Sequence, residues 1–238
     1  MENRKRQISG ASLAGIEIFS ALGAAERDAI AGLCRGQSYR AGELVISHRD
    51  PGREVFFIIS GSVRVSIYSS AGKEISFRDM RAGHMFGELS AIDGKPRSAQ
   101  VSALTAATLA FVTQKDFWTI LQAYPGVAEK IFKYLARLVR ALTDRVVDIS
   151  TLGVRNRIHA ELLRLGQETG SGLNEVAISP APRHAEIAHR VSTHREAVTR
   201  ELGGLVRQGI IGKARNALII RDMDRLGKMV LDVLRNET

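Results

Sequence analysis

Short apolar runs separated by glycines fill the first half of the chain, to about residue 124. The runs are rich in β-branched and aromatic residues and cover 44–46, 55–59, 63–68, 75–77 and 108–112. The intervening glycines are Gly42, Gly52, Gly61, Gly72, Gly83 and Gly94. Short strands divided by turn glycines at such regular spacing predict an antiparallel sandwich or barrel. Amphipathic patterns predict one short helix at 24–33 and another at 116–121.

A long helix is predicted from Pro125, because neither Gly nor Pro occurs between Gly126 and Gly153. Its apolar residues recur at spacings of three, four and once seven: Ile131, Leu135, Leu138, Leu142, Ile149 and Leu152. Arg145 interrupts this stripe, and Val146 stands beside it. The spacing predicts a helix that packs lengthwise against a partner helix. Packing within its own chain is the alternative, but the helix is long for a core helix, which favours a two-fold dimer.

The remainder of the chain predicts a smaller, mostly helical region. The expected elements are a helix at 154–165, a polar Gly/Ser stretch at 166–172, a strand at 176–178, two short helices from 183, a strand turn, and an amphipathic helix at 223–234. These changes of pattern predict an α+β protein with boundaries near 125 and 152. The three expected segments are 1–125, 126–152 and 153–238.

Composition narrows the function only slightly. The chain has 238 residues, of which 45% are hydrophobic and 25% charged, as in an ordinary packed protein. The net charge of +9 favours an anionic partner, either nucleic acid or an acidic membrane surface, although a solvated basic surface is the alternative. Cys34 is the single cysteine, which excludes an internal disulfide. No apolar run is long enough to span a bilayer, so we expect a cytoplasmic protein without a membrane partner.

The segment from Phe86 to Val101 has the chemistry of an anion site. Gly87 allows a backbone to approach a ligand closely. Residues 88–92 can form one helical turn, whose free N–H groups attract an anion. Arg97 can place its planar fork on the same anion, which suits a phosphate, and Ser98 adds a hydroxyl.

Glu88 is the unexpected member of this segment, because a carboxylate repels phosphate. It makes sense if the ligand also carries a hydroxyl donor, such as a ribose 2′-OH. The alternative is a structural salt bridge between Glu88 and Arg97, with the glycines serving only as turns.

Phe-Gly-Glu-Leu, a short turn and then Pro-Arg-Ser-Ala, at 86–99, resemble the phosphate-binding cassette of cyclic-nucleotide-binding domains. More narrowly, the chain resembles the cyclic-AMP receptor protein-like regulators of the CRP/FNR superfamily. Segments 18–22, 39–43, 50–52 and 59–65 extend the likeness upstream. It implies an α+β fold with a cyclic-nucleotide-binding, jelly-roll-like antiparallel β-roll in 1–125, a dimerisation helix in 126–152, and a winged helix-turn-helix in 153–238.

The resemblance also assigns nucleotide contacts. It places the cyclic phosphate on Arg97, Ser98 and the backbone near Leu89 and Ser90, beside Gly87, and the ribose 2′-OH on Glu88. In the family the adenine touches adjacent Thr and Ser residues of the long helix, where this chain has Leu142 and Thr143. Thr143 can still bond to a purine, but Leu142 cannot, so the choice between cyclic AMP and cyclic GMP stays open.

A helix-turn-helix is predicted in 183–202. The residues that can bury one side are Ile187, Val191, Val198 and Leu202, and Ala188 allows two helices to cross closely. Ser192 and Thr193 are expected to form the turn and to cap the next helix. Ser192 stands where the family usually has glycine, so a left-handed backbone would be slightly strained there. Glu201 stands where an apolar residue is common.

The second helix of this pair is expected to present Arg195, Glu196 and Arg200 outward. Arginine suits guanine O6 and N7, and glutamate can accept from a cytosine amino group. A Glu196–Arg200 pair on a solvated helix is the alternative. The resemblance implies base reading of a palindromic GTGA-like site by a dimer. It also implies phosphate contacts from Thr193 and His194, and a β-wing at 209–220 with Lys213 and Arg215 near its tip.

The expected function is therefore a DNA-binding transcription regulator that responds to cyclic AMP or cyclic GMP as an allosteric ligand. Its expected partners are double-stranded DNA with a palindromic operator, a second copy of the chain, and RNA polymerase. The same regulator with another signal (haem, a different metabolite, or none) is one alternative. A metal jelly-roll enzyme is another, but His48 and His84 stand apart. We predict no metal site and no enzyme activity.

Overall fold

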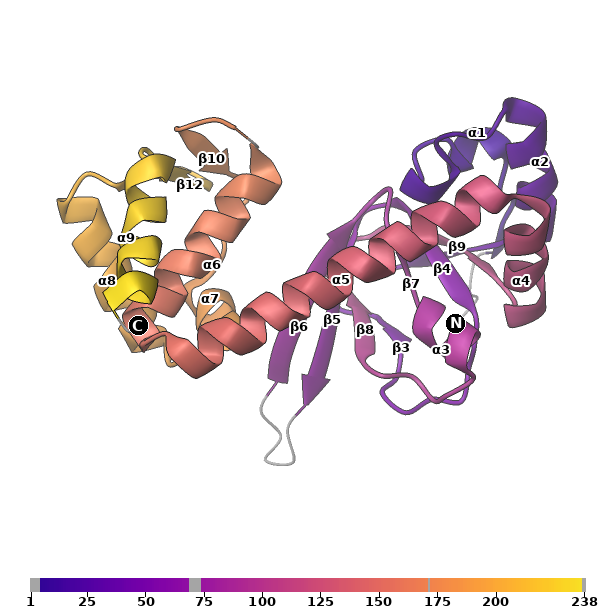
Figure 1. Cartoon of the computed structure of the whole chain (residues 1–238). Helices are drawn as coiled ribbons and strands as arrows, with labels where there is room; N and C mark the ends of the chain where they lie inside the picture. The colour runs from indigo at the N-terminus through magenta and orange to yellow at the C-terminus, as the bar shows by residue number, and fades with distance from the viewer. Residues whose placement is uncertain (1–4, 69–73, 171, 237–238) are drawn as a thin grey trace. The chain divides into compact units, whose positions relative to one another are not determined.

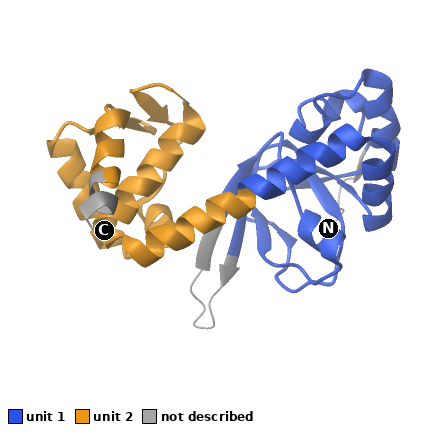
Figure 2. Cartoon of the chain, viewed as in Figure 1, with its two compact units in different colours: residues 1–137 blue, residues 138–238 orange. Residues whose placement is uncertain are grey.

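A computed structural model describes residues 5–68, 74–170 and 172–236. The chain divides into two compact units, residues 1–137 and residues 138–238 (Figure 2). The predicted turn at Gly72 and Ser171 of the predicted polar stretch lie outside the described residues.

Two antiparallel sheets form the first unit (Figure 1). The five-stranded sheet has the order β1-β2-β9-β4-β7, with β1 at Lys5–Arg6, β2 at Arg35–Tyr39, β9 at Ala107–Val112, β4 at Val55–Ser60 and β7 at Met85–Phe86. The four-stranded sheet has the order β3-β8-β5-β6, with β3 at Leu44–Ile46, β8 at Gln100–Ala103, β5 at Ser62–Tyr68 and β6 at Glu74–Arg81. The predicted antiparallel roll and its five strands are confirmed.

Strand β4 lies between two hydrophobic clusters. Val55 and Phe57 belong to one cluster, whereas Phe56 and Ile58 belong to the other. Successive side chains of a strand point to opposite faces, so alternate residues of one apolar strand can supply both cores.

The helices of the first unit cover one of these clusters. They are α1 at Gly10–Leu13, the short 3₁₀ turn at Glu17–Phe19, α2 at Ala24–Leu33, α4 at Gln114–Ala123 and the start of α5 at Pro125–Thr151 (Figure 1). Phe19, Ile30 and Phe117 from these helices are almost fully buried with Phe57.

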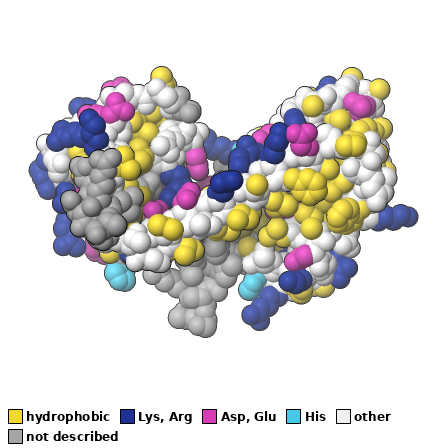
Figure 3. Space-filling view, in the orientation of Figure 1, with side chains coloured by type: hydrophobic (Ala, Val, Ile, Leu, Met, Phe, Trp, Pro, Cys, Tyr) yellow, Lys and Arg dark blue, Asp and Glu magenta, His cyan; other side chains and the backbone are white. Residues whose placement is uncertain are grey.

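The stripe along α5 differs from the predicted one. Ile131 is buried in the core of the first unit, and Leu152, just after α5, is buried against Ala160 and Val230. The exposed apolar stripe is instead Phe132, Val139, Leu142, Val146 and Ile149, with Leu135 half-buried between the first two; Val147, beside Val146, is exposed as well. Hydrophobic side chains are accordingly visible at the surface along α5 (Figure 3). The corrected spacing is an unbroken alternation of three and four, the pattern of a coiled-coil seam.

The second unit contains a three-stranded sheet and five helical segments among its described residues, counting the end of α5. The elements are α6 at Val154–Thr169, β10 at Val176–Ile178, α7 at His184–Arg190, α8 at Arg195–Arg207, β11 at Ile211–Ala214, β12 at Ala217–Ile220 and α9 at Met223–Asn236. The sheet order is β10-β12-β11. A hydrophobic core built from the helices and strands of this unit holds it together.

Helix α6 continues through Gly166, where the sequence suggested a loop. A Cβ atom on Gly166 would lie 2.6 Å from the Met223 sulfur and 2.9 Å from Ile220 Cδ1. This glycine therefore allows close packing instead of a turn. Within the described ranges, no helix is long and apolar enough to cross a membrane.

Candidate nucleotide site and DNA-binding surface

The cassette begins at a glycine whose backbone only glycine adopts easily. Gly87 has φ +86° and precedes α3, the short helix at Glu88–Asp93. A Cβ atom at Gly87 would lie 2.8 Å from the Glu54 carbonyl oxygen and 2.9 Å from Arg97 Nη1. The left-handed backbone and the missing side chain are thus both required here.

Arg97 is buried, with only 4% of its side chain exposed. Its Nη1 donates to the Gly87 carbonyl oxygen at 3.0 Å, and its Nη2 donates to Glu54 Oε2 at 3.0 Å. Its Nε is buried without a hydrogen-bond partner among the described residues. Burial lowers the pKa of the guanidinium, and Glu54 opposes that shift. The salt bridge that the sequence offered as an alternative is absent here, because Arg97 pairs with Glu54 and not with Glu88.

Glu88 is a buried carboxylate, with 4% of the residue exposed. Burial raises its pKa, while the charges of Arg78 and Arg97 act in the opposite direction. Neither arginine forms an ion pair with it in the described part of the chain. The Glu88 carboxylate is therefore a hydrogen-bond acceptor that no other described side chain uses, and it lies close to two cations.

Arg78 and Tyr134 border this carboxylate, and sequence reasoning missed both. Arg78 Nη1 lies 3.4 Å from the Tyr134 hydroxyl, and its guanidinium carbon lies 5.6 Å from the centre of the ring. Burial, followed by the charge of Glu88, raises the pKa of Tyr134 to about 12. The signal for Arg78 was weak, because β6 also carries Asp79 and Arg81, and only the strand register shows that Arg78 shares a face with the buried Met80.

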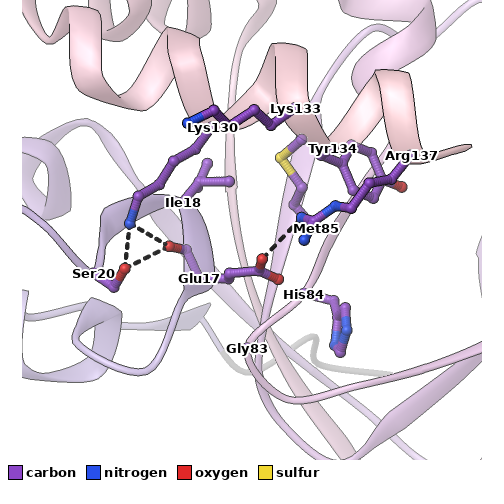
Figure 4. Close-up of a pocket in the computed structure, with 10 residues that line it drawn as sticks. All are labelled: Glu17, Ile18, Ser20, Gly83, His84, Met85, Lys130, Lys133, Tyr134 and Arg137. Atoms are coloured by element: carbon purple, nitrogen blue, oxygen red, sulfur yellow. Dashed lines mark hydrogen bonds and ion pairs between the residues drawn. The ribbon is translucent and has the colours of Figure 1, made fainter. Parts of the chain in front are cut away.

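Tyr134 also lines a cavity of about 290 Å³ (Figure 4). Lys130 donates to the Glu17 carbonyl oxygen and to Ser20 Oγ, and Arg137 Nη2 lies 3.0 Å from Glu17 Oε1. Lys133, the third lysine or arginine that lines the cavity, is paired with Glu129 at 2.6 Å. None of Gly87, Glu88 and Arg97 lines this cavity, and its lysines and arginine already have protein partners, so it is not the predicted phosphate site.

The remaining predicted nucleotide residues differ in exposure. Ser98 is exposed, Leu89 is 40% exposed, and Ser90 is buried. Leu142 and Thr143 belong to the second compact unit. Thr143 Oγ1 donates to the Val139 carbonyl oxygen at 3.0 Å, which leaves its lone pairs as acceptors. No group of three or more potential metal ligands occurs within the described ranges.

In the second unit, α7 and α8 form the predicted helix-turn-helix. Its apolar residues are all buried: Ile187, Ala188, Val191, Val198 and Leu202. Ser192 has φ +53°, so the expected left-handed turn residue is present. The predicted cap is wrong, because His194 occupies the N-cap of α8 and makes no side-chain capping bond. Thr193 N instead donates to the Ala188 carbonyl oxygen, which closes the turn.

The predicted base-reading side chains Arg195, Glu196 and Arg200 are exposed on α8. Glu196 and Arg200 do not form the i,i+4 pair that was the alternative in this described helix. Lys213 and Arg215 are exposed at the tip of the β11–β12 wing.

His184, at the start of α7, contacts α8. Its Nδ1 lies 2.7 Å from Thr199 Oγ1 on α8. Burial lowers its pKa, and the charges of Lys213 and Arg195 lower it further. Lys213 of the wing and Arg195 at the start of α8 therefore both act on the charge of His184.

Glu201, the charged residue at an apolar family position, is accounted for by its partners. It accepts from His159 Nε2 at 2.7 Å and from Arg155 Nε at 3.1 Å. His159 is 1% exposed, and burial lowers its pKa while Glu201 raises it. A buried histidine therefore takes the place of an apolar contact between α6 and α8.

A β-roll with a buried arginine and carboxylate, followed by a winged helix-turn-helix, defines a ligand-binding domain linked to a DNA-binding domain. Residues 36–124 match the family model of the cyclic nucleotide-binding domain, and residues 156–229 match that of the Crp-like helix-turn-helix domain. The chain belongs to the CRP/FNR superfamily and is a CRP-like DNA-binding regulator, not an enzyme.

Known relatives agree with this assignment. The chain is 27% identical over 188 residues to a CRP-like cAMP-activated global transcriptional regulator of Mycobacterium tuberculosis, covering 79% of this chain and 84% of that one. It is 26% identical over 208 residues to the cyclic AMP receptor protein of Thermus thermophilus, covering 87% and 94%. The solved structure of the c-di-GMP responsive regulator CLP of Xanthomonas campestris shares the fold, with a TM-score of 0.65, 20% identity and coverage of 83% and 99%.

Proposed function

We propose that this regulator binds cyclic AMP or cyclic GMP at the cassette, and that binding controls its affinity for DNA. The observation that carries this proposal is the trio of Gly87, with its left-handed backbone, and the buried Glu88 and Arg97. A buried carboxylate without a partner in contact, beside an arginine whose fork is only partly satisfied, is costly unless a ligand completes it.

The trio matches the two ends of a ribose cyclic phosphate. Arg97 would bind the phosphate with its fork, exchanging part of its pairing with the half-exposed Glu54. Ser98 and the backbone near Leu89 and Ser90 would add further donors. Glu88 would accept from the ribose 2′-OH, because an ionised carboxylate is acceptor-only.

Dimerisation would bring two such chains together through α5. The exposed stripe at Phe132, Leu135, Val139, Leu142, Val146 and Ile149 has the spacing of a two-stranded seam. Leu142 would contribute to this seam, and Thr143 beside it would accept from the purine. In this arrangement residues 1–125 form the nucleotide domain, 126–152 the dimer helix and 153–238 the DNA-binding domain. In the allosteric step, nucleotide binding would favour one arrangement of the two paired α5 helices over another.

The DNA contact would be made by α8 and the wing. Arg195, Glu196 and Arg200 would read base edges of a palindromic GTGA-like site. Contacts to phosphate would come from Thr193, His194, Lys213 and Arg215. RNA polymerase is the proposed partner at the promoter, in line with the cAMP-activated transcriptional regulator to which the chain is similar.

Titration calorimetry with cyclic AMP and cyclic GMP tests the ligand. Arg97→Met should abolish measurable binding of both, because the cyclic phosphate loses its charged partner. Lys95→Met is the matched control, since Lys95 lies in the same loop but is 79% exposed. Thermal unfolding of each variant checks that the fold persists. The absence of heat with both nucleotides, or unchanged affinity in a folded Arg97→Met, would refute the proposal.

Fluorescence anisotropy with a GTGA-containing duplex tests the DNA contact. Arg200→Ala should cost about 1–3 kcal/mol at one half-site position and should reduce discrimination against other bases there. Arg207→Ala on the same helix is the control. An equal loss of affinity for all DNA sequences would instead show that Arg200 contacts a phosphate.

A further inference from the structure

A charged residue, Arg78, occupies the inner face of the four-stranded sheet. In the strand register it lies opposite Val65, and Val65 lies opposite Val101. Directly opposite residues of antiparallel strands share a face, and so do residues two apart. Met80, two positions along from Arg78, is 3% exposed in a hydrophobic core, as is Val101 at 4%. Arg78 thus lies on the core-facing side of β6.

The neighbouring arginine has a different environment. Arg64 lies one position before Val65, so its side chain points to the opposite face of the sheet. There it forms a two-bond ion pair with Asp79, with both distances at 2.7 Å. Arg78 has no carboxylate in such contact within the described residues, and its nearest polar partner is the neutral hydroxyl of Tyr134.

Arg78 and Tyr134 also lie near Glu88. The charge of Arg78 lowers the pKa of Glu88, and the charge of Glu88 raises that of Tyr134. The strand register also brings Arg78, through Val65, into line with Val101, which follows the cassette residues Arg97 and Ser98 along the chain. Arg78 and Tyr134, which contact each other, are therefore the cationic and aromatic neighbours of the carboxylate that we assign to the ribose. Since the base is attached to the ribose, a group beside the ribose contact is close enough to meet the base.

We propose that Arg78, held by Tyr134, recognises the acceptor edge of a purine base, so that this site prefers cyclic GMP to cyclic AMP. The inference rests on the proposed cyclic-nucleotide function and specifies its base. Guanine offers two acceptors, O6 and N7, to the arginine fork, whereas adenine replaces O6 with an amino donor. Leu142 acts in the same direction, because it offers no acceptor to an adenine amino group.

The test is a set of calorimetric titrations with purine analogues. Cyclic IMP keeps O6 and N7 but lacks the guanine 2-amino group, whereas 7-deaza-cyclic GMP lacks only the N7 acceptor. We expect cyclic GMP and cyclic IMP to bind about 10- to 100-fold more tightly than cyclic AMP, as a bidentate contact to the base would give. The affinity for 7-deaza-cyclic GMP should lie between the affinities for cyclic GMP and cyclic AMP.

Two variants of Arg78 separate base reading from simple charge. Arg78→Met should remove the preference by weakening cyclic GMP much more than cyclic AMP. Arg78→Lys keeps the charge but loses the planar fork, so it should lose most of the preference as well. Arg64→Met, on the opposite face of the same sheet, should leave the preference unchanged. Thermal unfolding identifies any variant that fails to fold, in which case the analogue series on the unmodified protein decides.

Three results would overturn the inference. One is tighter binding of cyclic AMP than of cyclic GMP by the unmodified protein. Another is an equal loss for all purines in Arg78→Met, which would make Arg78 only a counter-ion for Glu88. The third is a preference that persists in Arg78→Met. In each of these cases the unmodified protein still binds a cyclic nucleotide, whereas the absence of binding by every nucleotide would refute the proposed function itself.

Discussion

Each compact unit contains a cluster of buried charges, and the two clusters are built differently. In the second unit, Glu161 is 1% exposed and both of its oxygens are used. Arg164 lies 2.5 Å from one oxygen and Arg190 lies 3.1 Å from the other. In the first unit, Glu88 is buried to a similar degree, yet no cation forms an ion pair with it among the described residues.

The difference separates a structural cluster from a binding site. Glu161 joins three helices, because its partners come from α5, α6 and α7. Asp148 of α5 adds a second contact to Arg164 at 2.7 Å. The fold itself compensates a buried charge that has a full set of partners. A buried charge without partners is compensated only when a ligand binds. Substitutions that remove each charge should therefore have opposite effects on stability.

The largest expected effect is that of Glu161→Gln. Removing one partner of a buried ion cluster leaves uncompensated charges, so the free energy of unfolding should fall by about 3 kcal/mol. Urea denaturation of the variant and of the parent measures this. Glu168→Gln, on the exposed side of the same helix, should change stability by less than about 0.5 kcal/mol. A small loss for Glu161→Gln would show that the cluster is not structural.

Glu88→Gln should have a smaller effect, and on a different property. The charged acceptor for the ribose hydroxyl is lost, so nucleotide affinity should fall by about 2 kcal/mol, or roughly 30-fold. The free energy of unfolding should rise, because a buried unpaired charge has been removed. Calorimetry and urea denaturation measure the two quantities. A loss of stability like that of Glu161→Gln would contradict the comparison.

A pH series separates the two clusters further. The pKa of Glu88 is raised in the folded chain, so its contribution to stability is fully present below the ordinary glutamate pKa. That contribution is lost as the pH rises through the raised folded-state value, where the folded chain must hold a buried carboxylate. We expect the stability advantage of Glu88→Gln over the parent to grow across this window. An advantage that is constant with pH would show that Glu88 does not titrate there.

Glu54→Gln should have the smallest effect. Glu54 is 43% exposed, so its ion pair with Arg97 contributes less than about 1 kcal/mol to stability. Because the same carboxylate competes with a phosphate for Arg97, nucleotide affinity should rise by about two- to threefold. Glu43→Gln, just after the exposed turn that precedes β3, is the calorimetric control. Weaker binding in Glu54→Gln would mean that Glu54 supports the ligand contact.

The sequence predicted the elements well because their signals are local. Periodicity located the long helix and five of the nine described strands of the roll, but not β1, β2, β7 and β8, and a contiguous motif located Gly87, Glu88 and Arg97. Contacts between distant segments left no such signal. Glu54 precedes Arg97 by 43 residues, and the partners of Glu161 come from three helices. The α5 stripe was misplaced for the same reason, since only the packed fold shows that Ile131 is buried and that Val146 is exposed.

The alternation along β4 also limits how this chain can change in length. Val55, Phe56, Phe57 and Ile58 contribute in turn to two cores, and Glu54 stands immediately before them. Deleting one residue from this strand would exchange the side chains between the cores and shift Glu54 relative to Arg97. Insertions and deletions in a lineage of such proteins should therefore accumulate in the loops around this strand and be absent from the strand itself.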